Sequence, residues 1–211
     1  MSLAIVAGTL AFAASATTPE AVGADADSAW VLRQLARPAP MHTAFVELRD
    51  SPLLKAPLRI SGEYRRPDAT TLVREVQSPY AETTTIRAGQ ATIARGTRSR
   101  SFSLARAPEL EGLQASFGAL LAGDRSTLER HYRLEATGTR QHWILTLVPR
   151  DAALAAKVRD IVLRGRGAEL RCIETHPVRG SEVQRTLLAS AARAAEGVDE
   201  GKALAALCNA D

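Results

Sequence analysis

The feature that most constrains the fold is a pair of short alternating runs joined by a tight turn. Between residues 58 and 65, apolar residues and glycine stand at every second position, with Arg, Ser and Glu between them. The sequence Arg-Arg-Pro-Asp follows at residues 65–68, and a second alternating run begins at Leu72. Successive side chains of a strand point to opposite faces, so a period of two predicts strands. We therefore expect two antiparallel strands here, joined by a turn at Pro67.

The same alternation recurs along most of the chain. About ten runs of this kind are separated by turn residues. Short strands at such spacing favour an antiparallel sheet or an open barrel over parallel βαβ units. The alternating runs contain, in order, Phe45, Ile60, Leu72, Ile86, Ile93, Phe102, Tyr132, Leu145, Ile161, Cys172 and Leu187.

Helices are predicted before and within this series. Asp27 or Ser28 can cap a first helix, because their side chains accept the free amide hydrogens of the first turn. This helix should end before Pro38, since proline disfavours helical geometry in the preceding residue. Asp124 is a second candidate cap, and residues 151–157 predict another turn or two. Between these segments, apolar residues recur at helical spacing, at Leu110, Leu113, Phe117, Leu120 and Leu121.

The N-terminus indicates the compartment. Residues 3–14 form an uncharged apolar run, which is shorter than the ~20 residues that a membrane-spanning helix needs. Ala14-Ser15-Ala16 fits the small-x-small cleavage pattern, so residues 1–16 are predicted to be a signal peptide, although no Lys or Arg precedes the run. Residues 24–26 are a second candidate cleavage site, and a buried N-terminal helix is the alternative to export. We expect a soluble periplasmic protein whose residues 17–26 form a flexible lead-in.

The C-terminal tail and the two cysteines lead to linked predictions. Residues 189–211 are rich in alanine and predict a helical tail, broken near Gly197 or Gly201. Cys172 and Cys208 are the two cysteines of the chain. An oxidising compartment favours a disulfide between them, which would tie the tail to the sheet. Two reduced, buried thiols are the alternative.

Patterns that signal catalysis, cofactors or nucleic-acid binding are missing. No pair of histidines or cysteines stands at metal-ligand spacing, and neither a nucleophile elbow nor a glycine-rich phosphate loop occurs. The net charge is +4, but the charges are mixed along the chain and aromatic residues make up 4%. A nucleic-acid partner would call for blocks of like charge or stacking side chains. We therefore expect no catalytic residue, no metal, no cofactor and no nucleic acid.

The order of these pieces resembles the LolA family of periplasmic carriers of outer-membrane lipoproteins. The resemblance runs from about residue 28 to residue 188. Four segments carry it. They are the first helix ending in Leu35 with the strand that follows, the run Gly62–Pro67, the run from Ser78 to Ile93, and the helix Leu110–Leu121 in the place of the lid helix.

This resemblance implies an α+β fold for residues 27–188: an incomplete antiparallel β-barrel, or half-barrel, covered by helices as in LolA and LolB. Its concave apolar face would accept acyl chains. Arg66 matches an arginine that holds the lid closed by bonding to helix backbone; an exposed turn arginine is the alternative. The chain departs from the family after Pro67, where residues 68–71 are Asp-Ala-Thr-Thr rather than bulky and apolar. The candidate cavity and lid residues are Leu35, Phe45, Ile60, Tyr64, Leu72, Leu110, Leu113 and Phe117.

The function implied is that of a monomeric carrier, which binds acyl chains of a lipoprotein or lipid and moves them toward the outer membrane. The implied partners are an inner-membrane donor complex and an outer-membrane acceptor. One alternative is a non-catalytic docking protein of an envelope complex. Another is an enzyme acting on a lipid or pigment precursor, which would need convergent polar groups in the cavity that the sequence does not reveal. The apolar residues between 110 and 117 are equally compatible with plain core.

Overall fold

The computed structural model describes residues 25–49, 58–104, 119–120, 122–180, 183–198 and 201–209. Within them lies one antiparallel 11-stranded sheet, in the order β6-β5-β4-β3-β2-β1-β11-β10-β9-β8-β7. The strands are β1 (Met41–Arg49), β2 (Leu58–Arg66), β3 (Thr71–Ser78), β4 (Glu82–Arg87), β5 (Gln90–Arg95), β6 (Arg98–Ser103), β7 (Tyr132–Gly138), β8 (Trp143–Pro149), β9 (Val158–Arg166), β10 (Glu169–Pro177) and β11 (Gln184–Leu188).

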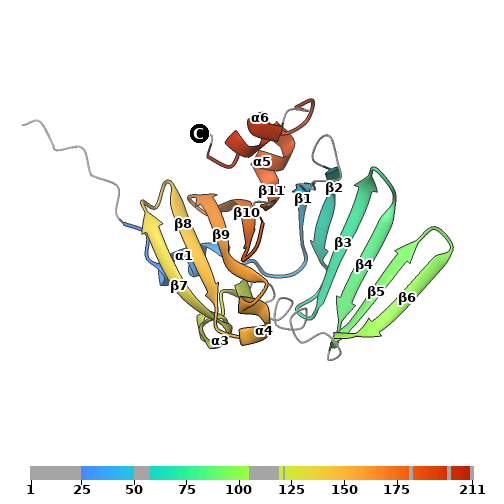
Figure 1. The fold of residues 1–211 in the computed structure, drawn as a ribbon, viewed down its shortest axis with the longest axis horizontal. Helices are drawn as coiled ribbons and strands as arrows, with labels where there is room; N and C mark the ends of the chain where they lie inside the picture. The colour runs from blue at the N-terminus through green and yellow to red at the C-terminus, as the bar shows by residue number, and fades with distance from the viewer. Residues whose placement is uncertain are drawn as a thin grey trace, which may run out of the picture.

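The first and last strands of the sheet meet at its centre. Phe45 of β1 stands opposite Leu188 of β11 on one side and opposite Gly62 of β2 on the other. Two runs of consecutive strands, β1–β6 and β7–β11, are therefore joined side by side. Figure 1 shows the result: β3–β6 and β7–β9 form two splayed wings with the central strands between them. The sheet is open, since β6 and β7 stand at the two ends of its order. This confirms the predicted half-barrel fold class.

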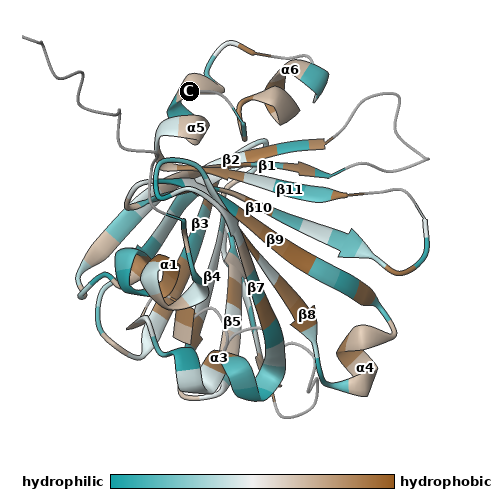
Figure 2. Cartoon of the chain, turned by 90° about the vertical axis from the view of Figure 1, so that its left-hand side faces the viewer, coloured by the Kyte–Doolittle hydropathy of each residue, from teal (hydrophilic) through white to brown (hydrophobic). Residues whose placement is uncertain are grey.

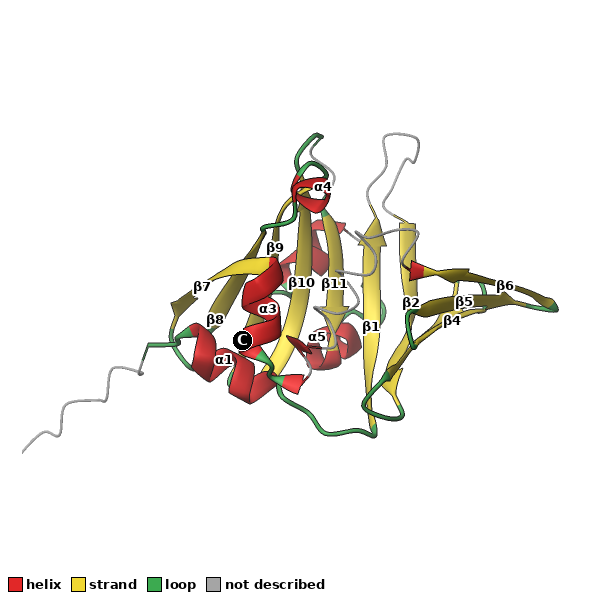
Figure 3. Cartoon of the chain, turned by 90° about the horizontal axis from the view of Figure 1, so that it is seen from below, coloured by secondary structure: helices red, strands yellow, loops and turns green. Residues whose placement is uncertain are grey.

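Two short helices begin at predicted caps, and a third begins in the predicted helical segment 151–157. The Asp27 carboxylate accepts from the Trp30 amide at 2.8 Å and starts α1 (Ser28–Leu35). Asp124 caps α3 (Arg125–His131) and Asp151 caps α4 (Ala152–Ala155) in the same way. The apolar side of α1 packs against the β7–β9 wing, in a cluster around the buried indole of Trp143. Figure 3 shows α1 and α3 beside that wing when the molecule is seen from below.

The two faces of the central strands pack against different partners. Val46 and Leu48 of β1 are buried on the convex face, under α5 (Ala189–Ala194) and α6 (Gly201–Ala206). Phe45, the residue before Val46, lies on the concave face with Ile60 and other apolar side chains. Figure 2 shows brown, apolar stretches along β8 and β9, whose inner side chains continue this concave face. The alternation read from the sequence thus supplies two separate apolar layers.

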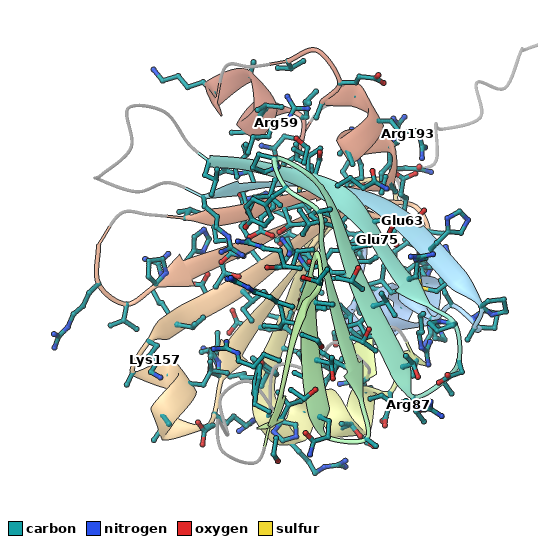
Figure 4. All side chains as sticks on the ribbon, turned by 90° about the vertical axis from the view of Figure 1, so that its right-hand side faces the viewer. Arg59, Glu63, Glu75, Arg87, Lys157 and Arg193 are labelled. Atoms are coloured by element: carbon teal, nitrogen blue, oxygen red, sulfur yellow. A yellow bond between two sulfur atoms is a disulfide. The ribbon has the colours of Figure 1, made fainter. Side chains whose placement is uncertain are left out.

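The C-terminal helices are fastened to the convex face at two places. Cys172 of β10 forms a disulfide with Cys208, which follows α6. Arg59 of β2 donates to the carbonyl oxygens of Ala195 and Val198, at 2.8 and 2.7 Å. Figure 4 shows Arg59 below these helices, while Glu63 of β2 and Glu75 of β3 lie on the outer face of the sheet. The tail therefore covers the side of the sheet that faces away from the concave surface.

The predicted signal peptide lies outside the described residues, and so do residues 110–117 of the expected lid. Among the helices that the structure does describe, none has the length and apolar character to cross a membrane.

Candidate ligand-binding trough

Two adjoining cavities lie on the concave face. The inner cavity, of about 370 Å³, is lined from both wings by side chains of β3–β6 and β7–β11. The outer cavity, of about 510 Å³, lies between the end of α1, the end of β2 and the start of β10. Tyr64, Leu72 and Leu120 line both, so the cavities form one continuous trough. Each volume falls in the range of ~300–1,000 Å³ that is typical of small-molecule sites.

The end of the inner cavity around Phe102 and Leu147 is mainly apolar. Aliphatic and aromatic side chains from opposite wings face each other there. Strands β3–β6 and the segment after β6 supply Leu72, Ile86, Ala91, Phe102 and Leu104. Strands β7–β9 supply Tyr132, Leu147, Ile161 and Leu163. The two wings therefore supply an apolar surface that neither could form alone.

The predicted cavity residues divide into three groups. Tyr64 and Leu72 line both cavities, and Leu35 lines the outer one. Phe45 and Ile60 lie on the concave face, but each is only 1% exposed and packs with Val76 and Leu188 beneath the cavity surface. The third group, Leu110, Leu113 and Phe117, lies outside the described residues.

Arg66 is a buried residue of the outer cavity rather than an exposed turn arginine. It is 9% exposed, and its guanidinium donates to the carbonyl oxygens of Arg37 at 2.9 Å and Ala69 at 3.4 Å. Arg37 follows α1, so Arg66 ties the end of β2 to the chain leaving that helix. The expected bond to the lid-helix backbone concerns residues that the structure does not describe.

The turn after Pro67 has its own polar arrangement. The Asp68 carboxylate accepts from the Thr70 amide and hydroxyl and from the Thr71 hydroxyl, each at 2.8 Å. These hydrogen bonds, led by the Thr70 amide, lower the pKa of Asp68 from 3.8 to about 2. Asp68, Thr70 and Thr71 therefore close a turn by side-chain hydrogen bonds.

A buried ion pair stands in the wall of the trough, and the sequence did not reveal it. The Glu47 carboxylate of β1 is 1% exposed and accepts from the Arg74 guanidinium of β3 at 2.7 Å. It also accepts from Gln184 at 2.9 Å and from Arg49. Glu47 stands two positions after Phe45 and so lies on the same face of the strand. A carboxylate on an apolar face is a signal for a buried partner. That partner is 27 positions away in sequence, so only the fold identifies it.

Aromatic rings surround the guanidinium. Arg74 lies over the Phe45 ring, 4.9 Å from its centroid, and the ring of Tyr64 is 4.7 Å from that of Phe45. Burial raises the pKa of the Tyr64 hydroxyl, so this group stays protonated near neutral pH. Arg74, Tyr64 and Gln184 all line the inner cavity. The end of the inner cavity around Arg74 is therefore polar, in contrast to its apolar end around Phe102 and Leu147.

The described residues offer no site for a metal. No group of three or more His, Cys, Asp or Glu side chains in that part of the chain could hold an ion. What the geometry presents is an open half-barrel with a deep, largely apolar trough on its concave face. The fold therefore defines an open antiparallel half-barrel protein with a cavity between the two wings of its sheet.

A protein-family model described as "Outer membrane lipoprotein carrier protein LolA-like" matches residues 14–211, and the chain belongs to that family. Comparison with curated proteins gave no match.

Solved structures with a similar fold include the LolA superfamily protein NE2245 from Nitrosomonas europaea, at 9% identity and a TM-score of 0.40, over 76% of this chain and 90% of that one. LprF from Mycobacterium bovis is 12% identical with a TM-score of 0.34, over 77% and 91%. A chain of the MucA/MucB complex from Pseudomonas aeruginosa is 15% identical with a TM-score of 0.36, over 77% of this chain and 56% of that one.

Proposed function

We propose that the protein is a periplasmic carrier, which binds acyl chains of a lipoprotein or lipid in the trough and moves them toward the outer membrane. An inner-membrane donor would load it, and an outer-membrane acceptor would unload it. The observation that carries this proposal is the continuous trough. Its apolar end, around Phe102 and Leu147, is built by both wings. Membership of the LolA-like family supports it. Residues 1–16 would direct the export that this role requires.

The energetics of acyl binding fit such a trough. Each buried CH₂ contributes about 0.8 kcal/mol, so ten methylenes would contribute on the order of 8 kcal/mol before ordering costs. That free energy corresponds to a dissociation constant of about 1 μM. Binding of this kind needs an apolar surface and no catalytic group.

A lid completes the proposal. Leu110, Leu113 and Phe117 would cover the trough, and Arg66 would hold the cover closed at the outer cavity. Hydrogen bonds from a charged donor contribute about 1.5–3 kcal/mol each, which is weak enough for the lid to open during transfer. The buried position of Arg66, at the end of β2, supports a holding role.

The test compares lipid bound to the natural protein with lipid bound to a blocked variant. The full chain is purified from the periplasm and analysed by native mass spectrometry for co-purified acyl species. Ile86 faces the inner cavity, and Arg87 is the next residue on β4 and is exposed. We expect Ile86→Trp to lose the bound species and Arg87→Trp to keep them. A natural protein that carries no lipid, and binds none when lipid is added, would contradict the proposal.

A docking protein of an envelope complex is the second candidate. β6 stands at one end of the sheet order, with β5 as its strand neighbour in the described part of the chain. An exposed edge strand can pair with a strand of another protein. Capture of a defined envelope partner by a lipid-free form, with loss of capture when Ser101 is replaced by Pro, would favour this function.

A further inference from the structure

The trough is polar where Arg74 enters it, which bears on the chemistry of its ligand. We propose that the trough selects acyl ligands with an acidic headgroup, a carboxylate or a phosphate, and that Arg74 receives this headgroup. The inference rests on the proposed acyl binding and adds a specificity to it. Arg74 is the one ionised side chain among the described residues that line the inner cavity.

Arg74 is held in place by contacts on its far side. Its Nη2 donates to Glu47 at 2.7 Å, and its guanidinium rests over the Phe45 ring. The hydroxyl of Tyr64 is a further hydrogen-bond partner. A guanidinium carries five N–H donors in a rigid fork, so these contacts leave donors for a ligand. The side chain remains 18% exposed, on the cavity side, and is therefore both fixed and accessible.

Arg74 shares its carboxylate partner with other donors. Both carboxylate oxygens of Glu47 are engaged, because Oε1 accepts from Arg49 and Gln184 and Oε2 accepts from Arg74. The second arginine, Arg49, is half-exposed, so water screens its charge. Hydrogen bonds between two ionised groups are roughly twice as strong as neutral ones. An anionic headgroup would therefore bind the remaining donors of Arg74 more strongly than a neutral ester.

The surrounding side chains suit a headgroup as well. Thr84 stands beside Arg74 in the β3–β4 register, and its side chain lines the same cavity. Gln184 and Thr186 contribute polar groups from β11 on the other side. The apolar end of the cavity, around Phe102 and Leu147, is left for the hydrocarbon chain. The cavity therefore has one polar end and one apolar end, which match the headgroup and the hydrocarbon chain of the proposed ligand.

The test uses three ligands that share one hydrocarbon chain. Palmitic acid, hexadecyl phosphate and methyl palmitate are titrated into the delipidated full chain, and their affinities are measured by displacement of a fluorescent acyl probe. We expect at least one of the two acidic ligands to bind about tenfold or more tightly than the ester, a difference of about 1.4 kcal/mol. The stronger of the two identifies the headgroup as a carboxylate or a phosphate.

Variants assign the preference to Arg74. Arg74→Gln should abolish the difference between acid and ester while the ester still binds. Arg87→Gln, which removes an exposed arginine of β4 on the same wing, should keep the difference. Glu47→Gln removes the negative charge beside Arg74 and should increase the difference in affinity between acid and ester. Circular dichroism establishes that each variant is folded.

The outcomes separate this inference from the carrier function. If the natural protein binds acid and ester equally, the inference is wrong and acyl binding stands, whatever the variants do. If none of the three ligands binds, the proposed carrier function fails as well.

Discussion

The guanidinium of Arg66 donates to the carbonyl oxygen of Arg37 at 2.9 Å and so joins the end of β2 to the chain that leaves α1. Both residues line the outer cavity. The contact therefore lies at the outer end of the trough, and its removal tests the proposed latch.

Arg66→Leu should speed release of a bound acyl ligand several-fold, because the proposed latch is lost. It should also cost about 1.5–3 kcal/mol of unfolding free energy, since the hydrogen bond has a charged donor and little exposure. Stopped-flow transfer to acceptor vesicles and urea unfolding measure the two effects. Arg87→Leu, an exposed position on β4, is the control. An exchange rate equal to that of the natural protein would make Arg66 a structural residue only.

Gly62 has no room for a side chain. A Cβ at this position would lie 1.9 Å from the carbonyl oxygen of Glu75, beside a register shift between β2 and β3. Backbone must therefore move, and Gly62→Ala should lower the free energy of unfolding by about 1–3 kcal/mol. Ser61→Ala, on the opposite face of the same strand, should change it by less than about 0.5 kcal/mol. Equal urea midpoints for the two variants would show that β2 and β3 accommodate the added Cβ with no loss of unfolding free energy.

The disulfide should stabilise the fold without affecting the trough. Cys172 and Cys208 are 36 positions apart, and closing a loop of that length contributes up to about 4 kcal/mol by restricting the unfolded chain. The double variant Cys172→Ala, Cys208→Ala should lose stability of this order in guanidinium unfolding and become insensitive to dithiothreitol. Acyl affinity should stay within about twofold, because the bond lies on the convex face. A large loss of affinity would mean that the C-terminal helices support the trough.

The turn at Asp68 makes a specific contribution to acid stability. Its pKa is lowered from 3.8 to about 2 by hydrogen bonds, first from the Thr70 amide. A depressed carboxyl pKa stabilises the fold above the unfolded value and loses that effect as pH falls through the folded value. The melting temperature of the natural protein relative to Asp68→Asn should therefore fall between pH 4 and pH 2 and stay level above pH 5. A constant difference across this range would contradict the role of the ionised carboxylate.

Local chemistry explains which elements could be predicted from the sequence. The side chains of Asp27, Asp124 and Asp151 mark helix starts, because each accepts an amide hydrogen three residues ahead. Alternation likewise predicts that Phe45 and Val46 lie on opposite faces of a strand, whatever that strand pairs with. Both signals depend only on neighbours in sequence. They predicted the helix starts and the antiparallel strands, and the resemblance to a known family added the half-barrel fold class.

The sequence by itself therefore determined an antiparallel sheet of alternating strands and its capped helices. Only the tertiary structure decided that β1 lies between β2 and β11, which brings Arg74 across Phe45 to Glu47 and places two wings around one trough. Strand order and the meeting of distant charges depend on contacts between segments far apart in the chain. A periodic pattern specifies which face a residue occupies, but it carries no information about which strand will stand opposite.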